Sequence, residues 1–263
     1  MTMAPVSHQP QTLAEALIAL QQQQADIERL HQAHEAWMRA VAHDLRAPLR
    51  HVVSFAPLLR ESVDELAAGA PQLADAAEDA REFAATMEQS ARKMSAMLDG
   101  MTHVSRVARA VLAVGVVDLV ALTQRVVQAL QTAHPLVQWQ LPQGSALVLA
   151  DASSLQQLVE AVLGNAIKFS AKQAQPQITV RVQQVAGGHW QWQVQDNGVG
   201  FDGQRAQALG QLFQRMHRDT EFEGVGCGLA LVDVVARRHA AQWRVHAQPQ
   251  EGCTFTLIWP SIA

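Results

Sequence analysis

The 263-residue sequence has little cysteine and no long apolar run. Its two cysteines, Cys227 and Cys253, are too far apart in the chain for a zinc knuckle or a redox motif, so we expect core-packing thiols in a reducing compartment. The longest apolar stretch, residues 110–117, is far shorter than the roughly 20 residues that a bilayer requires. We therefore expect a soluble, cytoplasmic chain with no membrane span.

Positive charge is also scarce. The 20 Lys and Arg residues are outnumbered by 24 Asp and Glu residues, which leaves a net charge of −4. A chain with this balance has no general attraction to DNA or RNA, so we expect no nucleic-acid partner. The length and the 49% hydrophobic composition suit two globular domains, each with its own core.

The first half of the chain has a helical pattern. Residues 1–12 carry two prolines and no apolar period, which predicts a disordered tail. From residue 13 to 66, apolar residues recur at spacings of mostly three, four or seven, which predicts one long amphipathic helix. A turn signal at residues 69–71 precedes a second helical period over residues 83–111. We expect residues 13–114 to form a helical hairpin domain.

A lone hairpin of this length leaves a broad apolar stripe uncovered. The usual remedy is to pair with a second copy as a four-helix bundle. We therefore predict an all-α, dimeric four-helix-bundle hairpin, with homodimerisation through this domain.

Residues 115–263 alternate between helical and strand patterns. A double glycine at 187–188 between two alternating runs is a good hairpin signal. The predicted helices cover residues 118–132, 151–169 and 228–239, and the predicted strands cover residues 137–141, 146–150, 178–184, 189–195, 243–247 and 254–260. This pattern predicts an α+β sandwich, with helices packed on one side of a mixed sheet.

A histidine followed by an aspartate stands out in the first helix. Pro48 cannot donate to the carbonyl of Asp44, so the helix should bend just after His43. At about 100° per residue, His43 lies roughly 200° from Val41 and Leu45, so it should face solvent while they face the seam. Asp44 can accept the Nδ1 proton and leave Nε2 of His43 as a nucleophile.

Three motifs in the second half could hold a nucleotide. Asn165 and Lys168 lie one turn apart on a predicted helix, where an amide oxygen and an ammonium could hold Mg²⁺ and phosphate together. Asp196 follows a predicted strand and can accept a hydrogen bond from an adenine amino group, and the glycines after it permit a tight turn. Segment 224–229, Gly-Val-Gly-Cys-Gly-Leu, opens a helix whose first amides suit a phosphate chain. Each motif alone has an ordinary structural explanation, as a buried amide, a turn or a glycine triplet.

Segment 43–50, His-Asp-Leu-Arg-Ala-Pro-Leu-Arg, resembles the phosphoacceptor box of sensor histidine kinases, in the form typical of their phytochrome-related branch. The three motifs of the second half, in their order and spacing, resemble the asparagine box and two glycine boxes of the Bergerat-type ATP-binding fold. Segments 212–215 and 251–255 resemble the phenylalanine box and the last glycine box of that fold. The resemblance covers almost everything from residue 37 to residue 260.

The resemblance implies an ATP-dependent protein histidine kinase with ATP and Mg²⁺ as cofactors. It would autophosphorylate His43, with Asp44 as general base, and pass the phosphoryl group to an aspartate of a response-regulator receiver domain. Asn165 would ligate Mg²⁺, and a lid between residues 213 and 228 would close over the phosphates. The residues that the resemblance assigns to nucleotide binding are Asn165, Lys168, Phe169, Asp196, Gly198, Gly200, Gly224, Gly226, Gly228, Leu229 and Thr254. We expect residues 115–263 to be the ATP-binding catalytic domain, which swings about a hinge at residues 114–118.

Three departures from the family pattern matter. Ala161 stands where many relatives carry a second asparagine, which predicts slower activity. Ala47 stands where many bifunctional relatives carry Thr or Asn, which predicts weak phosphatase activity. No sensor domain is recognisable before Leu13, so we expect input through the N-terminal helix, from a separate sensor protein or from a region missing here.

Two alternatives remain open at this point. The first is a pseudokinase, a dimeric docking or phosphotransfer platform whose ATP domain is weak or silent, and its sequence support is Ala161. The second is an ATPase of the wider Bergerat superfamily that works as a nucleotide-driven clamp. The second alternative leaves the phosphoacceptor box unexplained.

Overall fold

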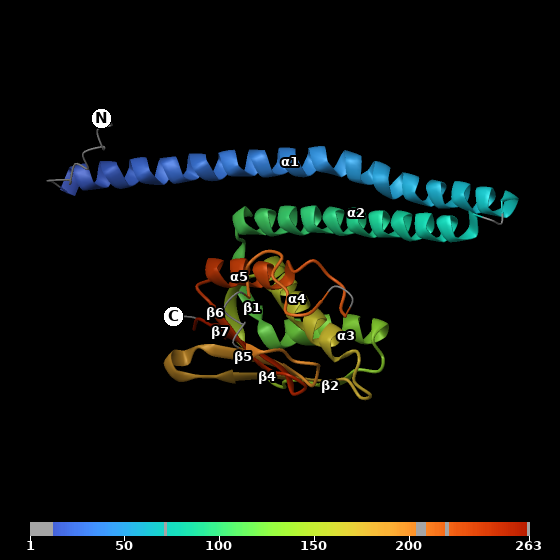
Figure 1. The fold of residues 1–263 in the computed structure, drawn as a ribbon. Coiled ribbons are helices and arrows are strands. Elements are labelled where there is room, and N and C mark those ends of the chain that lie inside the picture. The colour runs from blue at the N-terminus through green and yellow to red at the C-terminus, as the bar shows by residue number, and fades with distance from the viewer. Residues whose placement is uncertain (1–12, 71–72, 204–208, 219–220, 262–263) are drawn as a thin grey trace. The chain divides into compact units, whose positions relative to one another are not determined.

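The computed structural model describes residues 13–70, 73–203, 209–218 and 221–261, without the side chains of residues 13–16, 18–19 and 26–39 (Figure 1). The disordered tail expected at residues 1–12 lies outside the described residues. The chain divides into two compact units, residues 1–91 and residues 92–263. The expected domain boundary between residues 114 and 115 stays a prediction.

The first unit is a hairpin of two long helices. Helix α1 spans Leu13–Gly69, and helix α2 spans Ala74–Arg109, of which the part up to residue 91 belongs to this unit. The side chains buried in this hairpin recur every seven residues on each helix, the spacing of a coiled-coil seam. They are Ala42, Leu49 and Ala56 on α1, and Ala77, Ala84 and Ala91 on α2. Small residues at most of these positions allow the two backbones to approach closely.

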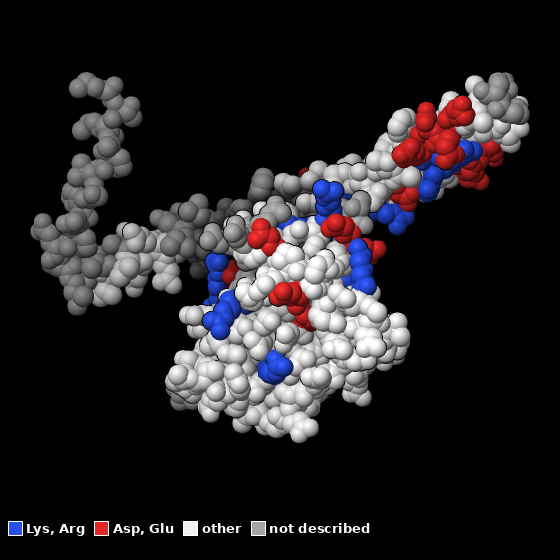
Figure 2. All heavy atoms as spheres, turned by 60° about the horizontal axis from the view of Figure 1, so that its bottom comes forward, with Lys and Arg blue, Asp and Glu red and all other residues white. Residues whose placement is uncertain are grey.

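Ion pairs reinforce the hairpin near its turn. Arg60 of α1 lies 2.8 Å from the buried carboxylate of Glu88 on α2. Arg81 of α2 lies 2.5 Å from Asp64 of α1 and 3.0 Å from Glu78. Figure 2 shows charged side chains of both signs gathered at this end of the hairpin, whereas the visible face of the second unit carries few charges.

A line of large apolar side chains on α1 has no cover in the single chain. Leu45, Leu59 and Leu66 are exposed and are spaced by multiples of seven residues, so they lie on one line along the helix. This line is distinct from the buried one, and Leu45 is 46% exposed. Inside the hairpin the neighbouring Ala42 packs instead, so the expectation that Leu45 faces a seam stays a prediction for the dimer. Phe55, Phe83 and Met87 add to the exposed apolar surface of this unit.

Helix α1 continues through both of its prolines, Pro48 and Pro57. In Figure 1 its axis changes direction in the second half of the helix. A proline inside a helix removes one backbone hydrogen bond and crowds the preceding turn, so these two residues account for the curvature.

The second unit contains the end of α2 and a sandwich of helices on a sheet. Its helices are α3 (Leu119–Ala133), α4 (Ala152–Ser170) and α5 (Gly228–Arg238), and they cover one face of the main sheet (Figure 1). The main sheet has the strand order β2-β4-β5-β7-β6. Its strands are β2 (Gln138–Gln140), β4 (Gln177–Gln184), β5 (Trp190–Asp196), β6 (Gln242–Gln248) and β7 (Gly252–Trp259). Strand β2 pairs in parallel with β4, and the other pairs are antiparallel.

The expected hairpin between β4 and β5 is present. It turns through the short 3-10 helix η2 (Ala186–Gly188), in which Gly187 and Gly188 both have positive φ. Together with the helical hairpin of the first unit, this sandwich confirms the predicted fold class, a helical hairpin followed by helices on a mixed sheet.

A separate two-stranded sheet corrects the expected hinge. Residues 114–118 form strand β1 (Val114–Asp118), which pairs antiparallel with β3 (Leu147–Asp151) along its whole length. The Asp118 side chain then caps α3 by accepting from Val120 N at 3.0 Å. A segment fixed by a strand ladder and a helix cap cannot serve as a free hinge, so the assignment to residues 114–118 is wrong.

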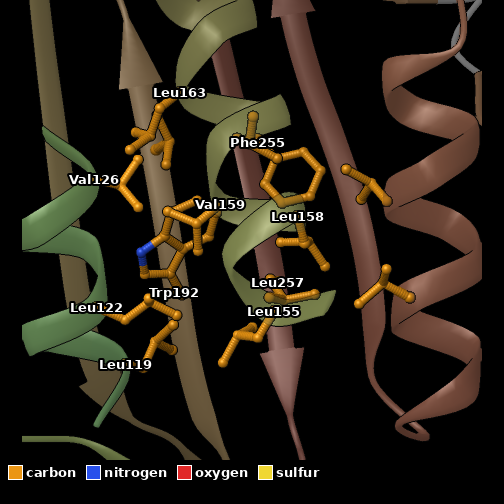
Figure 3. Packing of buried hydrophobic residues seen from close by; sticks show 14 of the residues in the cluster. Leu119, Leu122, Val126, Leu155, Leu158, Val159, Leu163, Trp192, Phe255 and Leu257 are labelled. Atoms are coloured by element: carbon orange, nitrogen blue, oxygen red, sulfur yellow. The ribbon is translucent and has the colours of Figure 1, made fainter. Parts of the chain in front are cut away.

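The core of the second unit lies between the sheet and its helices. Trp192 of β5 is surrounded by Leu119, Leu122 and Val126 of α3 and by Leu155, Leu158, Val159 and Leu163 of α4, with Phe255 and Leu257 of β7 beside it (Figure 3). The indole Nε1 of Trp192 donates to Thr123 Oγ1 at 3.1 Å, and Thr123 donates to the carbonyl of Leu119 at 2.7 Å. Both buried polar groups therefore have partners, as a stable core requires.

Candidate active site

A cavity of about 260 Å³ opens in the second unit, between α4, the sheet, the start of α5 and the residues before α5. It brings together most of the residues expected to bind a nucleotide. Those that line it are Asn165, Lys168, Phe169, Asp196, Gly200, Gly224, Gly226, Gly228 and Leu229. These residues come from three separate segments of the sequence.

The acidic group of the cavity is Asp196, the last residue of β5. It is 6% exposed, and its carboxylate accepts a hydrogen bond of 2.8 Å from the backbone N–H of Gly198. Burial raises the pKa of Asp196 to about 6, although backbone hydrogen bonds from Gly198 and Cys253 oppose the shift. A carboxyl group held in this way can accept a hydrogen bond from a ligand in the cavity.

The turn after Asp196 packs so tightly that it requires glycine. A Cβ on Gly198 would lie 2.5 Å from the carbonyl oxygen of Phe169, and one on Gly200, at φ +58°, would lie 1.9 Å from the carbonyl oxygen of Gln248. Gly198 does not line the cavity itself. Its contribution is to orient Asp196 and to let the turn lie against the end of α4.

Helix α4 contributes an amide and a cation. Asn165 lies beside the first residue of α5, since a Cβ on Gly228 would be 3.7 Å from Asn165 Nδ2. A Cβ on Gly224 would likewise lie 3.5 Å from Lys168 Nζ. The same ammonium lies 4.4 Å from the ring centre of Phe169. Burial, and then the charge of Arg215, lower the pKa of Lys168.

The N-terminus of α5 borders the same part of the cavity. Its N-cap residue is Cys227, and no side chain caps the helix there. Glycines at 224, 226 and 228 leave the backbone of this turn accessible from the cavity. Uncapped N–H groups at a helix start, with Lys168 beside them, form an environment that favours a phosphate group.

Hydrogen bonds to backbone carbonyls hold the chain that precedes α5. The N–H of Phe213 donates to the carbonyl of Gly226 at 3.0 Å. The guanidinium of Arg215 donates to the carbonyl of Phe222 at 2.5 Å and to the carbonyl of Gly224. These bonds join the two ends of the segment that faces the cavity.

The histidine of the first unit has the geometry expected of a nucleophile. The side chain of His43 is 84% exposed, and its Nδ1 lies 3.1 Å from Asp44 Oδ1. The tautomer protonated at Nδ1 makes this hydrogen bond and leaves Nε2 with a free lone pair directed at solvent.

Both halves of the chain match known families. Residues 33–109 match the His Kinase A (phospho-acceptor) domain, and residues 150–262 match the histidine kinase-, DNA gyrase B-, and HSP90-like ATPase family. The chain belongs to the sensor histidine kinases of two-component systems. The expected resemblance is thus confirmed.

Individual relatives agree with this assignment. Cyanobacterial phytochrome A from Nostoc sp. (strain PCC 7120) is 29% identical over 244 residues, which are 89% of this chain and 29% of the phytochrome. The structure of the mycobacterial sensor histidine kinase MprB is 26% identical with a TM-score of 0.51, and the match covers 56% of this chain and 97% of that one. Full-length ShkA, solved in complex with AMPPNP, shares the fold at 21% identity and a TM-score of 0.55, over 86% of this chain and 45% of ShkA. The chain spans less than a third of the length of its phytochrome and phytochrome-like relatives.

One expected site residue of this sensor histidine kinase lies elsewhere. Thr254 does not line the cavity, because strand alternation directs Cys253 and Phe255 of β7 to the cavity side. Thr254 lies opposite Gln195 and His246 on the other face of the sheet. The sequence motif located this strand correctly, but a motif does not show which face each of its residues occupies.

Several cavity residues of the kinase were not expected from the sequence. Arg215 and His217 line the cavity from the segment before α5, and Cys253 and Phe255 line it from β7. Arg215 stands inside the phenylalanine-box motif, which was the available signal for that segment. His217 carried no recognisable motif.

Two properties of the described residues bear on cofactor and membrane. No group of three or more His, Cys, Asp or Glu side chains among them could hold a metal ion. Within the same ranges, no helix is long and apolar enough to cross a membrane.

Proposed function

We propose that this chain is an ATP-dependent protein histidine kinase that autophosphorylates His43 and passes the phosphoryl group to an aspartate of a response-regulator receiver domain. The observation that carries the proposal is the polarity of the cavity. The cavity is lined by a buried carboxyl group and by an ammonium that lies beside a glycine-rich turn and a helix start. These groups suit the adenine and the phosphates of a nucleoside triphosphate.

In this proposal the adenine amino group donates to Asp196, and the phosphate chain lies along residues 224–229 near Lys168. The AMPPNP complex of ShkA supports a nucleotide in this fold. The carbonyl oxygen of Asn165 is a suitable hard ligand for Mg²⁺. Nucleotide-bound Mg²⁺ takes most of its other ligands from phosphate and water, so one amide oxygen without an acidic cluster fits it. When bound, Mg²⁺ neutralises charge on the phosphates.

The residues around His43 then perform the transfer. The Nε2 lone pair attacks the γ-phosphorus as the bond from that phosphorus to the β,γ-bridging oxygen breaks, and ADP leaves with the electron pair. Positive charge develops on the imidazole, and Asp44 stabilises it by accepting the Nδ1 proton. The product is a phosphohistidine at Nε2, from which the receiver aspartate takes the phosphoryl group.

We also propose that the kinase acts as a homodimer through the hairpin. The exposed line formed by Leu45, Leu59 and Leu66 supports this, because a second copy would remove it from water. The use of ATP and a receiver domain supports a cytoplasmic location. Input would come through α1, from a separate sensor protein or from a region missing here.

Nucleotide binding tests the proposal against a silent ATP domain. A fluorescent ATP analogue with Mg²⁺ should bind the full chain, and binding should weaken at least tenfold in Asp196→Ala and Asn165→Ala variants. An Asn197→Ala variant is the matched control, because Asn197 lies next to Asp196 but bonds to Gln175 and Gln177 outside the cavity. A wild-type chain that binds no nucleotide would favour the pseudokinase platform.

A further inference from the structure

Three aromatic rings meet between the end of α4 and residues 209–218 and 221–227, which we call the segment before α5. The ring centre of His217 lies 5.2 Å from that of Phe169 and 5.1 Å from that of Phe222. Phe169 and Phe222 also contact each other, edge to face, at 5.1 Å. We call Phe169, His217 and Phe222 the ring cluster. It joins a segment that borders the cavity to the fixed scaffold of α4.

His217 forms part of the wall between two cavities. On one side it lines the nucleotide cavity of about 260 Å³, and on the other it lines a second cavity of about 340 Å³, together with Lys172, Glu221 and Phe222. Movement of this one ring would therefore change the wall of the nucleotide site.

The surroundings of His217 are mostly cationic. Lys168 lies over the Phe169 ring at 4.4 Å, and Lys172 lies over the Phe222 ring at 4.5 Å. Arg215, two residues before His217, adds a third positive charge from the segment itself, and Glu221 is the acidic group that faces the imidazole, at 3.9 Å from Nδ1. The side chain of His217 is 17% exposed. A protonated imidazole here would lose hydration and face three cations against one carboxylate.

Arg215 fixes the other side of the ring cluster. Its guanidinium bonds to the carbonyl of Phe222, so the backbone of Phe222 is held while its ring packs on His217. The packing of the imidazole between two phenyl rings is therefore the adjustable contact, and its strength depends on whether the ring is neutral.

We propose that His217 is a positioning residue of the nucleotide site, whose neutral ring ties the segment before α5 to α4 and whose protonation releases that segment and weakens nucleotide retention. The inference rests on the proposed ATP site. His217 acts through the segment that it holds and takes no part in the transfer itself.

The sign of the pH effect follows from the charge distribution. Burial lowers the pKa of His217, Glu221 opposes the shift, and Lys168, Lys172 and Arg215 add to it. We call the state in which the His217 ring holds the segment before α5 against α4 the clasp, and the state without this contact the released state. The clasp therefore binds fewer protons than the released state, so it gains stability as the pH rises. It is fully formed above the ordinary histidine pKa of about 6.5 and is lost as the pH falls below that value.

The test compares the wild-type chain with His217→Phe, which keeps a ring in the cluster but cannot be protonated, and with His217→Ala, which removes the ring. Affinity for a fluorescent ATP analogue with Mg²⁺ is measured from pH 5.5 to pH 8. At pH 8 the wild type and His217→Phe should agree within about twofold, and His217→Ala should bind several-fold more weakly. Between pH 8 and pH 5.5 the affinity of the wild type should fall by up to about tenfold more than that of His217→Phe. About tenfold is the largest effect that one titrating group can have one pH unit below its ordinary pKa of about 6.5. His246→Ala, an exposed histidine on β6, should follow the wild type at every pH.

Amide hydrogen exchange of the nucleotide-free chain gives an independent readout. The two proteins are compared at the same pH, so that the pH dependence of the intrinsic exchange rate cancels. Residues 209–218 should exchange faster in the wild type than in His217→Phe at pH 5.5, and at the same rate in both proteins at pH 8. Parallel pH profiles of the two proteins, in binding or in exchange, would overturn the inference. If no protein bound nucleotide while the exchange difference remained, the clasp would stand and the proposed ATP site would be wrong.

Discussion

Asp196 of β5 and Gly198 are joined by a hydrogen bond of 2.8 Å from the backbone N–H to a carboxylate that is almost fully buried. Burial raises the pKa of this carboxyl group to about 6 in the nucleotide-free protein. A donor from adenine favours the charged carboxylate, so nucleotide binding should lower this pKa and release protons near pH 6. Affinity should therefore rise with pH through this range.

Calorimetric titration in two buffers of different ionisation enthalpy measures this proton release directly. We expect a release of a substantial fraction of a proton near pH 6 and little at pH 8, where Asp196 is already ionised. The release should persist in part in His217→Phe, fall in Asp196→Asn, and disappear only when both substitutions are combined. Equal proton release by the wild type and Asp196→Asn would contradict the role of Asp196 at the adenine end.

The tight turn after β5 predicts a contrast between two glycines. Gly200→Ala places a Cβ within 1.9 Å of the Gln248 carbonyl oxygen at a positive φ, so the free energy of unfolding should fall by at least about 2 kcal/mol. Gly164→Ala, inside α4, meets no atom within 4 Å beyond its own helix backbone and should raise it by about 0.5–1 kcal/mol. Urea unfolding of both variants checks the prediction, which fails if the two changes have the same sign.

A native cysteine permits a reversible lock within the second unit. A Cβ on Gly100 of α2 would lie 3.1 Å from the Cβ of Cys227, which precedes α5, so Gly100→Cys should form a disulfide with Cys227 after a small shift. The lock fixes the nucleotide site to α2, so it would prevent the domain swing expected from the sequence. We expect oxidation to lower autophosphorylation at least tenfold and dithiothreitol to restore it.

The double variant Gly100→Cys, Cys227→Ser is the control for this lock, because it cannot form the disulfide. Its autophosphorylation should be the same under oxidising and reducing conditions. Full activity of the oxidised single variant, with the disulfide verified by mass spectrometry, would show that α5 need not leave α2.

The residue one turn after His43 predicts the balance of activities. Ala47 has no side chain that could orient a water molecule for dephosphorylation of the receiver domain. We expect little phosphatase activity from the wild type and at least a several-fold gain in Ala47→Thr. The assay follows loss of label from a receiver domain that the chain has phosphorylated, and rapid loss with the wild type that depends on Asp44 would contradict the prediction.

The sequence predicted those parts of the molecule that are encoded locally. The apolar spacing of three, four or seven residues in the hairpin and the glycine-rich turns are short-range patterns, and the fold class followed from them. The strand at residues 114–118 was missed because its pairing with β3 joins segments about thirty residues apart, and nothing within β1 itself indicates that partner.

The candidate site shows the same division. Asn165, Asp196 and the glycines stand in recognisable motifs, and the structure brings them to one cavity. The bonds of Arg215 to two carbonyls and the packing of His217 between two rings depend on tertiary contacts that no motif records. The position of Thr254 depends on strand register, which the order of residues in a short motif does not determine.

The most direct test of the central claim is phosphorylation of His43 itself. The purified chain is incubated with Mg²⁺ and γ-labelled ATP, beside His43→Ala and Asn165→Ala, and the labelled protein is then treated with acid and with base. We predict label on the wild type that is acid-labile, base-stable and absent from both variants. Nucleotide that binds without any labelling, or label that survives on His43→Ala, would contradict the claim that this chain is a kinase acting on His43.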